Sequence, residues 1–536
     1  MAGELWDAVV VGTGFGGSVT AARLAAEGRR VLVLERGRPW PPGSFPRTPR
    51  DMPRILWDPE ASRFGVFDVW GFDAMTAVVA SGLGGGSLIY ANVQLRKPAG
   101  TFAGWPLDAA DLDGHYARIE AVLHPTPYPE HWTRPGRVHE MPKAAAAAGL
   151  RTERPPLAVA FAADEARREP VREEVPNLHG VGRLTCRRCG ECDIGCNDGA
   201  KSTMDLTFLS RARADGAVVR ALSEARAITR LPDGTWELGV LQHSAGRDGA
   251  DPELLHPDPA ETRFTVRAKH VVLAGGTLGS VRLLWANRHV LPGLSDRLGR
   301  RVSANGDLLG FVRGAAVWLD PSAGPVITTS THVPADRSPS GRAFYVQDGG
   351  HPQFVDWLWN LLDLPGSVSA GTRTAWRRWL DRARGRRDPQ LSDELARLIG
   401  PATASGTMMP VLAMGHDDAG ARIVVDDDGE PNILWDGDRA YFDGVRQVLH
   451  TIAHGLGGRF QQSPGAEAFT VHPVGGCAMS PTPEEGVCDP LGRVHRLAGL
   501  HVHCGAVLPG AVGPNPSLTI AAVADRCSDA LLEDLS

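Results

Sequence analysis

Residues 6–35 read WDAVVVGTGFGGSVTAARLAAEGRRVLVLE and decide the fold of the amino-terminal region. The short apolar runs 8–11 and 31–34 are typical of buried strands, and residues 19–27 between them have helical spacing. Gly28 fits a helix stop. The sequence therefore predicts a strand, a glycine-rich turn, a helix and a second strand, which together form the βαβ unit of an α/β fold.

The turn in this unit has the spacing Gly12-x-Gly14-x-x-Gly17, and Glu35 ends the second strand. Glycines permit the tight turn and let the backbone approach a pyrophosphate at the helix N-terminus, while the carboxylate can accept hydrogen bonds from ribose hydroxyls. The negative charge of Glu35 disfavours a 2′-phosphate, so NADP is not expected. The motif predicts a dinucleotide site without choosing between FAD and NAD.

The composition is that of a globular protein, with 43% hydrophobic and 22% charged residues in a chain of 536. A formal net charge of −6 disfavours binding through bulk electrostatics, so no nucleic-acid partner is expected. The absence of a run of about 18 uncharged apolar residues argues against a transmembrane helix. The N-terminus lacks the pattern of a signal peptide. We therefore expect a cytoplasmic protein whose eight cysteines do not form disulfides.

Four of these cysteines form a cluster with the spacing Cys186-x2-Cys189-x2-Cys192-x3-Cys196. The spacing matches the bacterial ferredoxin run that holds [4Fe–4S] clusters, although Asn197 stands where proline is usual. Tetrahedral zinc is one alternative, but its common sites set two CxxC pairs further apart. A metal-free thiol cluster is the other alternative. The residues alone leave all three interpretations open.

Residues 354–362 (FVDWLWNLL) form an apolar run, and seven arginines against one aspartate follow between 373 and 387. A core helix followed by a solvated basic face is one interpretation. The other is a lid, or a peripheral patch on a membrane surface, that admits a lipophilic substrate. Residues 347–350 and 415–418 look like turns, to which we assign no catalysis.

Three further segments carry a family resemblance: GGGSLIYAN at 84–92, HPVGGC at 472–477 and LPGAVGPNPSLTI at 508–520. Together they resemble the glucose–methanol–choline (GMC) oxidoreductases, and most closely the cholesterol-oxidase-like branch. The resemblance implies an α/β fold with a discontinuous, Rossmann-like FAD-binding domain and an α+β substrate domain with a large, mainly antiparallel sheet. We expect the FAD-binding domain to comprise 1–100, 180–310 and 466–536, with the cysteine cluster 186–196 inserted. The substrate domain would comprise 101–179 and 311–465.

The resemblance also implies a site. His472 would be the base or hydroxyl-positioning residue, with Asn515 as its partner, because a histidine can take the hydroxyl proton while a hydride passes to flavin N5. The chain departs from the family at Cys504, where aspartate is usual, and at Tyr90-Ala91. The expected FAD contacts are Gly12, Gly14, Gly17, Glu35, Gly85, Gly86, Ser87, Asn92, Ala227, Gly505, Pro516 and Ser517.

These features predict an FAD-dependent enzyme that oxidises a hydrophobic alcohol, such as a 3β-hydroxysteroid, to a carbonyl. An iron–sulfur cluster near the flavin would pass electrons outward and favour a dehydrogenase over an oxidase. The acceptors considered are O2, a quinone and a redox protein. Two alternatives remain: a non-redox lyase of GMC type with structural FAD, and a flavoprotein electron-transfer module centred on the cysteines.

Overall fold

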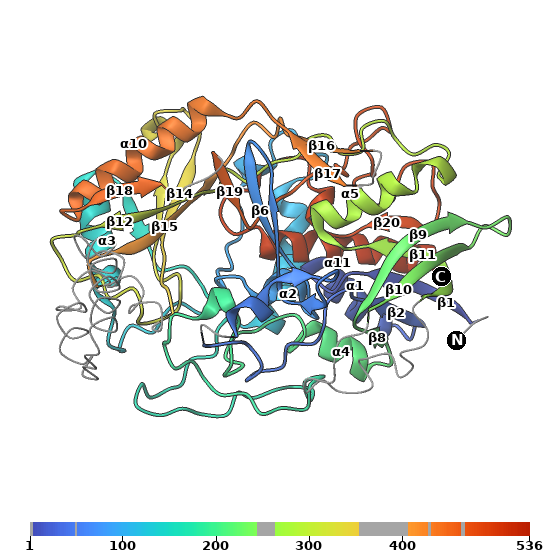
Figure 1. Ribbon diagram of the computed structural model, residues 1–536, viewed down its shortest axis with the longest axis horizontal. Coiled ribbons are helices and arrows are strands. Elements are labelled where there is room, and N and C mark those ends of the chain that lie inside the picture. Colours follow the sequence, from blue (N-terminus) through green and yellow to red (C-terminus); the bar gives the residue numbers. More distant parts are fainter. Residues whose placement is uncertain (1–3, 49–50, 244–262, 353–405, 427–429, 463–466) are drawn as a thin grey trace, which may run out of the picture.

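The computed structural model describes residues 4–48, 51–243, 263–352, 406–426, 430–462 and 467–536. The apolar run 354–362 and the arginine-rich segment 373–387 lie outside the described residues. Two large sheets lie towards opposite ends of the molecule, with smaller sheets between them (Figure 1). Among the described residues, no helix has both the length and the apolar character needed to cross a bilayer.

The first large sheet contains the predicted βαβ unit. Its parallel part has the order β8, β2, β1, β11 and β20, and Val10 at its centre pairs with Val33 on one side and Val272 on the other. The central strands are buried, as parallel strands covered on both faces must be. Strands β10 and β9 extend the sheet in antiparallel fashion. The strands are β1 (Leu5–Val11), β2 (Val31–Leu34), β8 (Val218–Arg220), β9 (Ser223–Arg230), β10 (Trp236–Gln242), β11 (Arg263–Leu273) and β20 (Leu500–Val502).

Helices pack around this sheet and bring the two ends of the chain together (Figure 1). The first helix, α1 (Phe15–Ala26), begins four residues before the predicted helical run, directly after the turn. It packs on α4 (Phe208–Ala214) and on the last helix, α11 (Ser517–Asp534). Helix α2 (Asp113–Leu123) also packs on α11, and α5 (Gly276–Ala286) contacts β9.

The second large sheet is antiparallel throughout. Its order is β18 (Arg459–Gln462), β12 (Leu308–Arg313), β15 (Met409–Gly415), β14 (Phe344–Asp348), β13 (Ser330–Val333) and β7 (Arg151–Glu153). Helix α10 (Arg439–Gly455) contacts β12 and β18, and α3 (Gly136–Ala147) contacts both α10 and β7. The predicted fold class, a Rossmann-like sheet combined with a second region on an antiparallel sheet, is confirmed.

A small sheet joins the two large ones. Strand β19 (Ala468–Thr470) pairs with β6 (Met75–Ala80), which pairs with β5 (Phe67–Gly71), and β19 also packs against β12. The residues that follow β19 therefore emerge between the two large sheets. Two further pairs are β3 (Trp57–Asp58) with β4 (Arg63–Phe64), and β16 (Arg422–Val425) with β17 (Pro431–Leu434).

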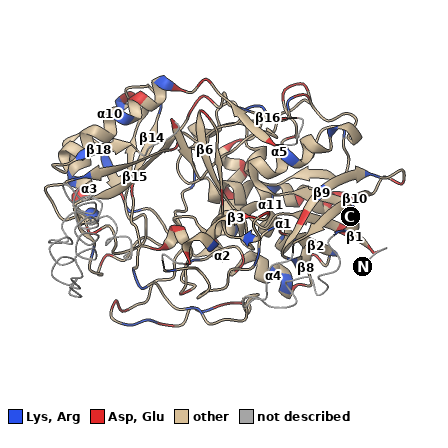
Figure 2. Cartoon of the chain, viewed as in Figure 1, with Lys and Arg blue, Asp and Glu red and all other residues tan. Residues whose placement is uncertain are grey.

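Basic and acidic side chains are interspersed along the outer helices and loops of the described chain (Figure 2). On α10, for example, Arg446 pairs with Asp443 at 2.7 Å and with Glu467 at 3.3 Å. Between α1 and α11, Arg23 pairs with Asp525 at 2.7 Å. Basic and acidic residues are nearly equal in number in the whole chain, 56 against 62, so opposite charges are available to pair across its surface.

Candidate active site

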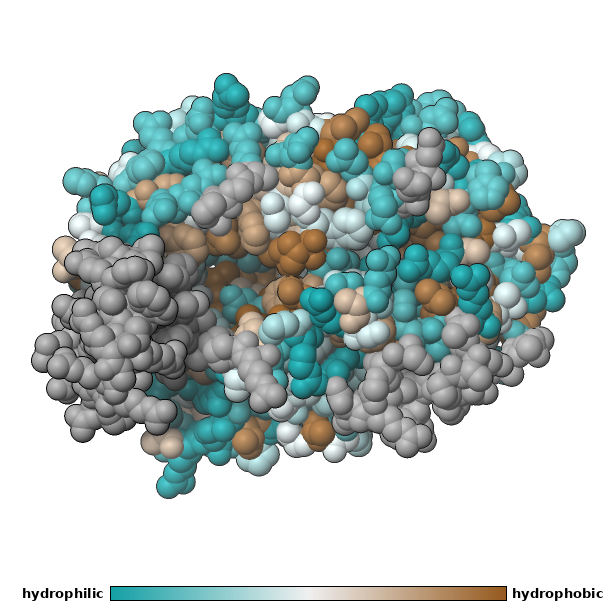
Figure 3. Space-filling model, in the orientation of Figure 1, coloured by the Kyte–Doolittle hydropathy of each residue, from teal (hydrophilic) through white to brown (hydrophobic). Residues whose placement is uncertain are grey.

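One cavity of about 1010 Å3 has walls from both large sheets. Residues 12–16 and Glu35 line it from the first sheet, and Leu309 and Phe311 line it from the second. Small-molecule sites usually enclose about 300–1,000 Å3, so this cavity has room for a cofactor and a substrate together. Figure 3 shows the molecule hollowed near the centre of one face, with hydrophobic side chains beside the hollow.

The glycine-rich turn forms part of the cavity wall. Gly14 precedes α1, and a Cβ atom built on it would have no heavy atom within 4 Å. A Cβ on Gly85, whose φ is +52°, would lie 2.6 Å from the Cα of Gly14. Gly14 therefore leaves space open, and Gly85 lets the loop 84–92 touch the turn. Gly17 lies away from the cavity, and its Cβ would lie 2.0 Å from the oxygen of Gly12.

Glu35 lines the cavity at the end of β2 and is held by the turn itself. Its Oε2 accepts hydrogen bonds from the Thr13 backbone nitrogen at 3.0 Å and from Thr13 Oγ1 at 2.7 Å. Its Oε1 accepts from the nitrogen of Gly37 at 2.9 Å. Burial raises the pKa of Glu35. Thr13, which the sequence pattern did not single out, also accepts a hydrogen bond from Gly84 N at 3.0 Å and so links the turn to the loop 84–92.

Three helices begin at the cavity. Its wall includes residues 14–16 at the start of α1, 275–279 at the start of α5, and 515–517 at the start of α11. The first N–H groups of a helix have no intrahelical partner and carry partial positive charge, so they attract anionic groups. The pyrophosphate of FAD suits this arrangement. Gly505, predicted as a cofactor contact together with Pro516 and Ser517, also lies in the wall.

Asn92 gives the clearest sign of a missing ligand. It is fully buried and lines the cavity; its side chain lies beside the Cys192 thiol and makes no hydrogen bond of good geometry to a described residue. Buried amides are normally hydrogen-bonded, so a molecule in the cavity is the natural partner. With the open space at Gly14 and the three helix N-termini, the residues present fit FAD.

Besides Gly17, two further predicted cofactor contacts lie outside the cavity wall. Ser87 holds its own loop, because its Oγ donates to Gly84 O at 2.7 Å and accepts from Met204 N at 2.9 Å. Ala227 is exposed on β9, whereas Ala225 lies in the cavity wall. Gly86, by contrast, lines the cavity as the resemblance implies.

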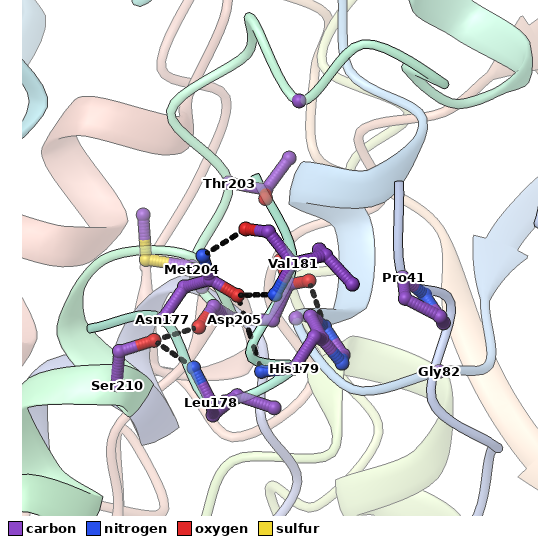
Figure 4. Close-up of polar contacts among 12 residues, drawn as sticks. Pro41, Gly82, Asn177, Leu178, His179, Val181, Thr203, Met204, Asp205 and Ser210 are labelled. Atoms are coloured by element: carbon purple, nitrogen blue, oxygen red, sulfur yellow. Dashed lines mark hydrogen bonds and ion pairs between the residues drawn. The ribbon is translucent and has the colours of Figure 1, made fainter. Parts of the chain in front are cut away.

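Figure 4 shows a polar cluster in which Asn177, His179 and Asp205 lie together. The neighbouring Met204 N donates to Ser87 of the loop 84–92. His179 Nε2 and Asp205 Oδ2 lie 2.7 Å apart, and both side chains are almost fully buried. A Cβ on Gly84, whose φ is +108°, would lie 2.9 Å from Asp205 Oδ1. Asn177 Oδ1 accepts from the nitrogen of His179 at 3.2 Å. This cluster gives Gly84 a steric reason to be glycine.

His472 faces the cavity two residues after β19. Its Nδ1 lies 2.8 Å from Oδ2 of Asp307, which is fully buried. A carboxylate can only accept, so Nδ1 donates and Nε2 is left without a proton in the neutral ring. The Oγ1 of Thr470 donates to the same Asp307 oxygen at 2.9 Å and accepts from the nitrogen of His472 at 2.9 Å. Asp307 precedes β12, and no local motif marks it in the sequence.

Asn515 lines the same cavity and pairs with a second amide. Its Oδ1 accepts from Gln347 Nε2 at 2.8 Å, and its Nδ2 donates to Gln347 Oε1 at 3.2 Å. Gln347 lies in β14, which ends at Asp348, so the turn prediction for 347–350 is wrong at its first two residues. Lys97 donates to the carbonyl oxygens of Pro514 and Asn515, and burial lowers the pKa of Lys97 to about 7. The structure thus brings the two predicted catalytic residues to one cavity.

The four clustered cysteines are free thiols that lie behind the loop 84–92. Burial raises the pKa of Cys189 to about 12, and burial also raises the pKa of Cys186. Lys201 is buried between the cluster and the loop, and its Nζ donates to the oxygens of Cys192 at 2.6 Å, Tyr90 at 2.9 Å and Leu88 at 3.0 Å. In the described part of the chain, no three His, Cys, Asp or Glu side chains surround a point where a metal ion could sit.

A cavity with three helix N-termini and a histidine in its wall suits a dinucleotide cofactor and a proton-transfer reaction. Two family models, both described as GMC oxidoreductase, match residues 6–287 and 440–524. The chain therefore belongs to the GMC oxidoreductase family and is an FAD-dependent alcohol oxidoreductase.

Individual relatives agree with this placement. The chain is 31% identical to a cholesterol oxidase of Mycobacterium tuberculosis, over 98% of this chain and 90% of that one. It is 24% identical to a long-chain-alcohol oxidase of Arabidopsis thaliana, over 98% of this chain and 66% of that one. The crystal structure of pyridoxine 4-oxidase from Mesorbium loti superposes with a TM-score of 0.60 and 18% identity, covering 98% and 99% of the two chains. The last match shows the shared fold.

Proposed function

We propose that this enzyme oxidises a lipophilic alcohol, with a 3β-hydroxysteroid as the first candidate, and that His472 is the base. The observation that carries the proposal is the contact of His472 Nδ1 with Asp307 at 2.8 Å, which leaves Nε2 for the substrate. The hydroxyl proton would move to Nε2 as the carbonyl forms. When bound, FAD supplies the acceptor for the hydride that leaves the carbinol carbon. Asn515, beside Gln347, would hold the substrate oxygen.

The cavity wall supports a lipophilic substrate. Next to the polar residues it contains apolar side chains from the second sheet and from the segments beside it, namely Leu309, Phe311, Val326, Ile327, Leu412 and Phe469. Apolar walls favour apolar ligands because burial releases water from both surfaces. The names of the relatives, a cholesterol oxidase and a long-chain-alcohol oxidase, point to the same substrate class.

Anaerobic mixing of the holoenzyme with alcohols tests this proposal. We expect a 3β-hydroxysteroid or a long-chain alcohol to bleach the flavin absorbance, and glucose or choline to leave it unchanged. The substitution His472→Ala should slow bleaching by about 10²–10⁴-fold, the usual contribution of a general base. His289→Ala, at an exposed position, is the control. Bleaching by polar alcohols alone, or an unchanged rate in H472A, would contradict the proposal. Product formation without bleaching would instead indicate the lyase alternative.

We also propose that Cys186, Cys189, Cys192 and Cys196 bind an iron–sulfur cluster. The all-thiol donor set supports this, together with the contact that Lys201 makes from Cys192 to the loop 84–92. Such a cluster would accept electrons one at a time. Protein purified without oxygen should contain about four iron atoms per chain and a broad absorbance beneath the flavin bands. Cys192→Ser should lose the iron, while Cys527→Ser should retain it. Zinc, or no metal, in the wild-type protein would overturn the proposal.

The electron acceptor is a separate part of the proposal. Oxygen is the acceptor suggested by the names of the relatives, and peroxide release on turnover would identify an oxidase. A dye-linked assay without peroxide would indicate a dehydrogenase.

We further propose the FAD-binding domain as 1–100, 180–310 and 466–536, which is supported by the sheet that joins β1, β11 and β20.

A further inference from the structure

The turn 303–307 contacts the segments that hold both proposed catalytic residues. Asn305 Nδ2 donates to Gly513 O at 2.6 Å, and its Oδ1 accepts from Val512 N at 2.9 Å, just before Asn515. At the end of the same turn, Asp307 contacts His472. The turn is therefore placed to set the relative position of the two side chains.

Asp307 is the residue of this turn that can affect proton transfer at His472. Its side chain is fully buried, and its Oδ2 accepts from both His472 Nδ1 and Thr470 Oγ1. Its Oδ1 has no hydrogen-bond partner among the described residues. Among the described residues, Asp307 pairs with no lysine or arginine, so His472 is the group whose charge it can balance.

From this geometry we propose that Asp307 is the positioning residue of the base: it selects the tautomer with the proton on Nδ1 and stabilises the imidazolium that forms when Nε2 takes the substrate proton. The inference rests on the proposed role of His472. A carboxylate buried against imidazole has this effect because ring orientation and the developing positive charge both depend on it. Asp307 itself neither gains nor loses a proton.

Other ionisable groups surround the turn without contacting His472. Asp417 Oδ2 accepts from Gly306 N at 3.1 Å, and Tyr441 donates to Gly306 O at 3.1 Å. Both lie against the turn rather than against the imidazole. Asp417 therefore offers a matched control: it is a buried carboxylate that contacts the same turn and has no hydrogen bond to His472.

Nitrogen NMR of ¹⁵N-histidine-labelled holoenzyme tests the tautomer directly. With His472→Gln used to assign the signals, neutral His472 should show a protonated Nδ1 and a bare Nε2. In Asp307→Asn the protonated nitrogen should change or the two tautomers should mix, and Asp417→Asn should leave the wild-type pattern. A wild-type ring protonated on Nε2 would overturn the inference, whatever the enzyme oxidises.

Kinetics provide the second readout. Asp307→Asn should lower kcat/KM by about 10²–10⁴-fold, mainly through kcat, because the imidazole loses the partner that orients it. Asp417→Asn should leave kcat/KM near the wild-type value. If D307N does not fold, Thr470→Val should show a smaller loss of kcat/KM that Thr470→Ser restores. Wild-type kcat/KM in these variants would refute the role of Asp307 and leave the proposed function intact.

Discussion

Gly14 precedes α1 and Gly16 lies in its first turn, two residues later, yet their surroundings differ completely. A Cβ on Gly14 would meet no atom within 4 Å, whereas a Cβ on Gly16 would lie 1.6 Å from the backbone oxygen of His503. Gly14 belongs to the expected dinucleotide motif, but Gly16 does not. The requirement at Gly16 arises from a residue almost 500 positions away, so only the packed structure reveals it.

These surroundings predict opposite effects of two substitutions. Gly16→Ala should lower the free energy of unfolding by about 1–3 kcal/mol or more, since backbone must move to admit the methyl group. Gly14→Leu should leave the unfolding of the apoprotein unchanged and abolish FAD binding, because the side chain would enter the cavity. Urea unfolding of apoproteins and flavin content after purification separate the two outcomes. A Gly16→Ala variant as stable as wild type would show that the contact is not required.

The buried hydrogen bonds of Lys97 predict a second effect of a single substitution on the free energy of unfolding. Its buried Nζ satisfies two carbonyl oxygens beside Asn515, so Lys97→Met should leave them without donors and cost about 1–3 kcal/mol of unfolding free energy. Lys269 pairs with Asp7 while about half exposed, so Lys269→Met should cost at most about 1 kcal/mol. Equal losses in the two variants, measured by urea unfolding, would contradict this account.

Among the elements, adjacent parallel strands β11 and β20 bring three histidines together. His270 Nδ1 and His501 Nε2 lie 3.1 Å apart, and His503 Nδ1 lies 2.9 Å from Thr20 Oγ1 on α1. Burial lowers the pKa of His503 to about 3 and that of His501 well below its usual value. Both rings are therefore neutral within the packed strands at physiological pH.

The burial of His503 beside these strands predicts that the folded protein loses stability as the pH falls. As pH falls from about 6.5 towards 3, the unfolded chain binds a proton at His503 that the folded chain does not, which lowers the unfolding free energy by about 1.4 kcal/mol per pH unit. His503→Asn should flatten this loss, and the exposed His289→Asn should not. Urea unfolding between pH 6.5 and pH 4.5 measures both slopes. Identical slopes for H503N and wild type would exclude His503 as the cause.

At the scale of the whole molecule, the cavity exists because two sheets face one another across it. Residues 12–16, 275–279 and 515–517 reach it from the first sheet and its helices, while Leu309 and Phe311 reach it from the second. A cofactor bound there contacts segments that are distant in sequence, so binding and global folding are coupled.

This coupling predicts that removal of FAD lowers Tm and that added FAD restores it. At a free concentration near 100 times Kd, the gain should be about 2.7 kcal/mol at 25 °C. Scanning calorimetry of the apoprotein with increasing FAD measures the effect, and Gly14→Leu should show no gain. A Tm independent of FAD, or raised equally by NAD, would contradict the prediction.

Short sequence patterns were enough to predict the elements that are formed by neighbouring residues. The βαβ unit and the turn with Gly12 and Gly14 follow from short motifs, because strand and helix periodicity and turn chemistry are properties of neighbouring residues. The pairing of His472 with Asn515 is instead what the resemblance to the GMC oxidoreductases implies. The cysteine spacing likewise appears in the sequence, although it leaves the bound species open.

Tertiary structure decided which groups complete the site. Asp307 reaches His472 across 165 positions, Gln347 reaches Asn515 across 168, and Lys201 joins the cysteine cluster to the loop 84–92. None of these side chains lies in a motif, because each acts through a contact made only when distant strands pack. Burial then sets their chemistry, since removal of water makes a single hydrogen-bond partner decide where a proton or a charge resides.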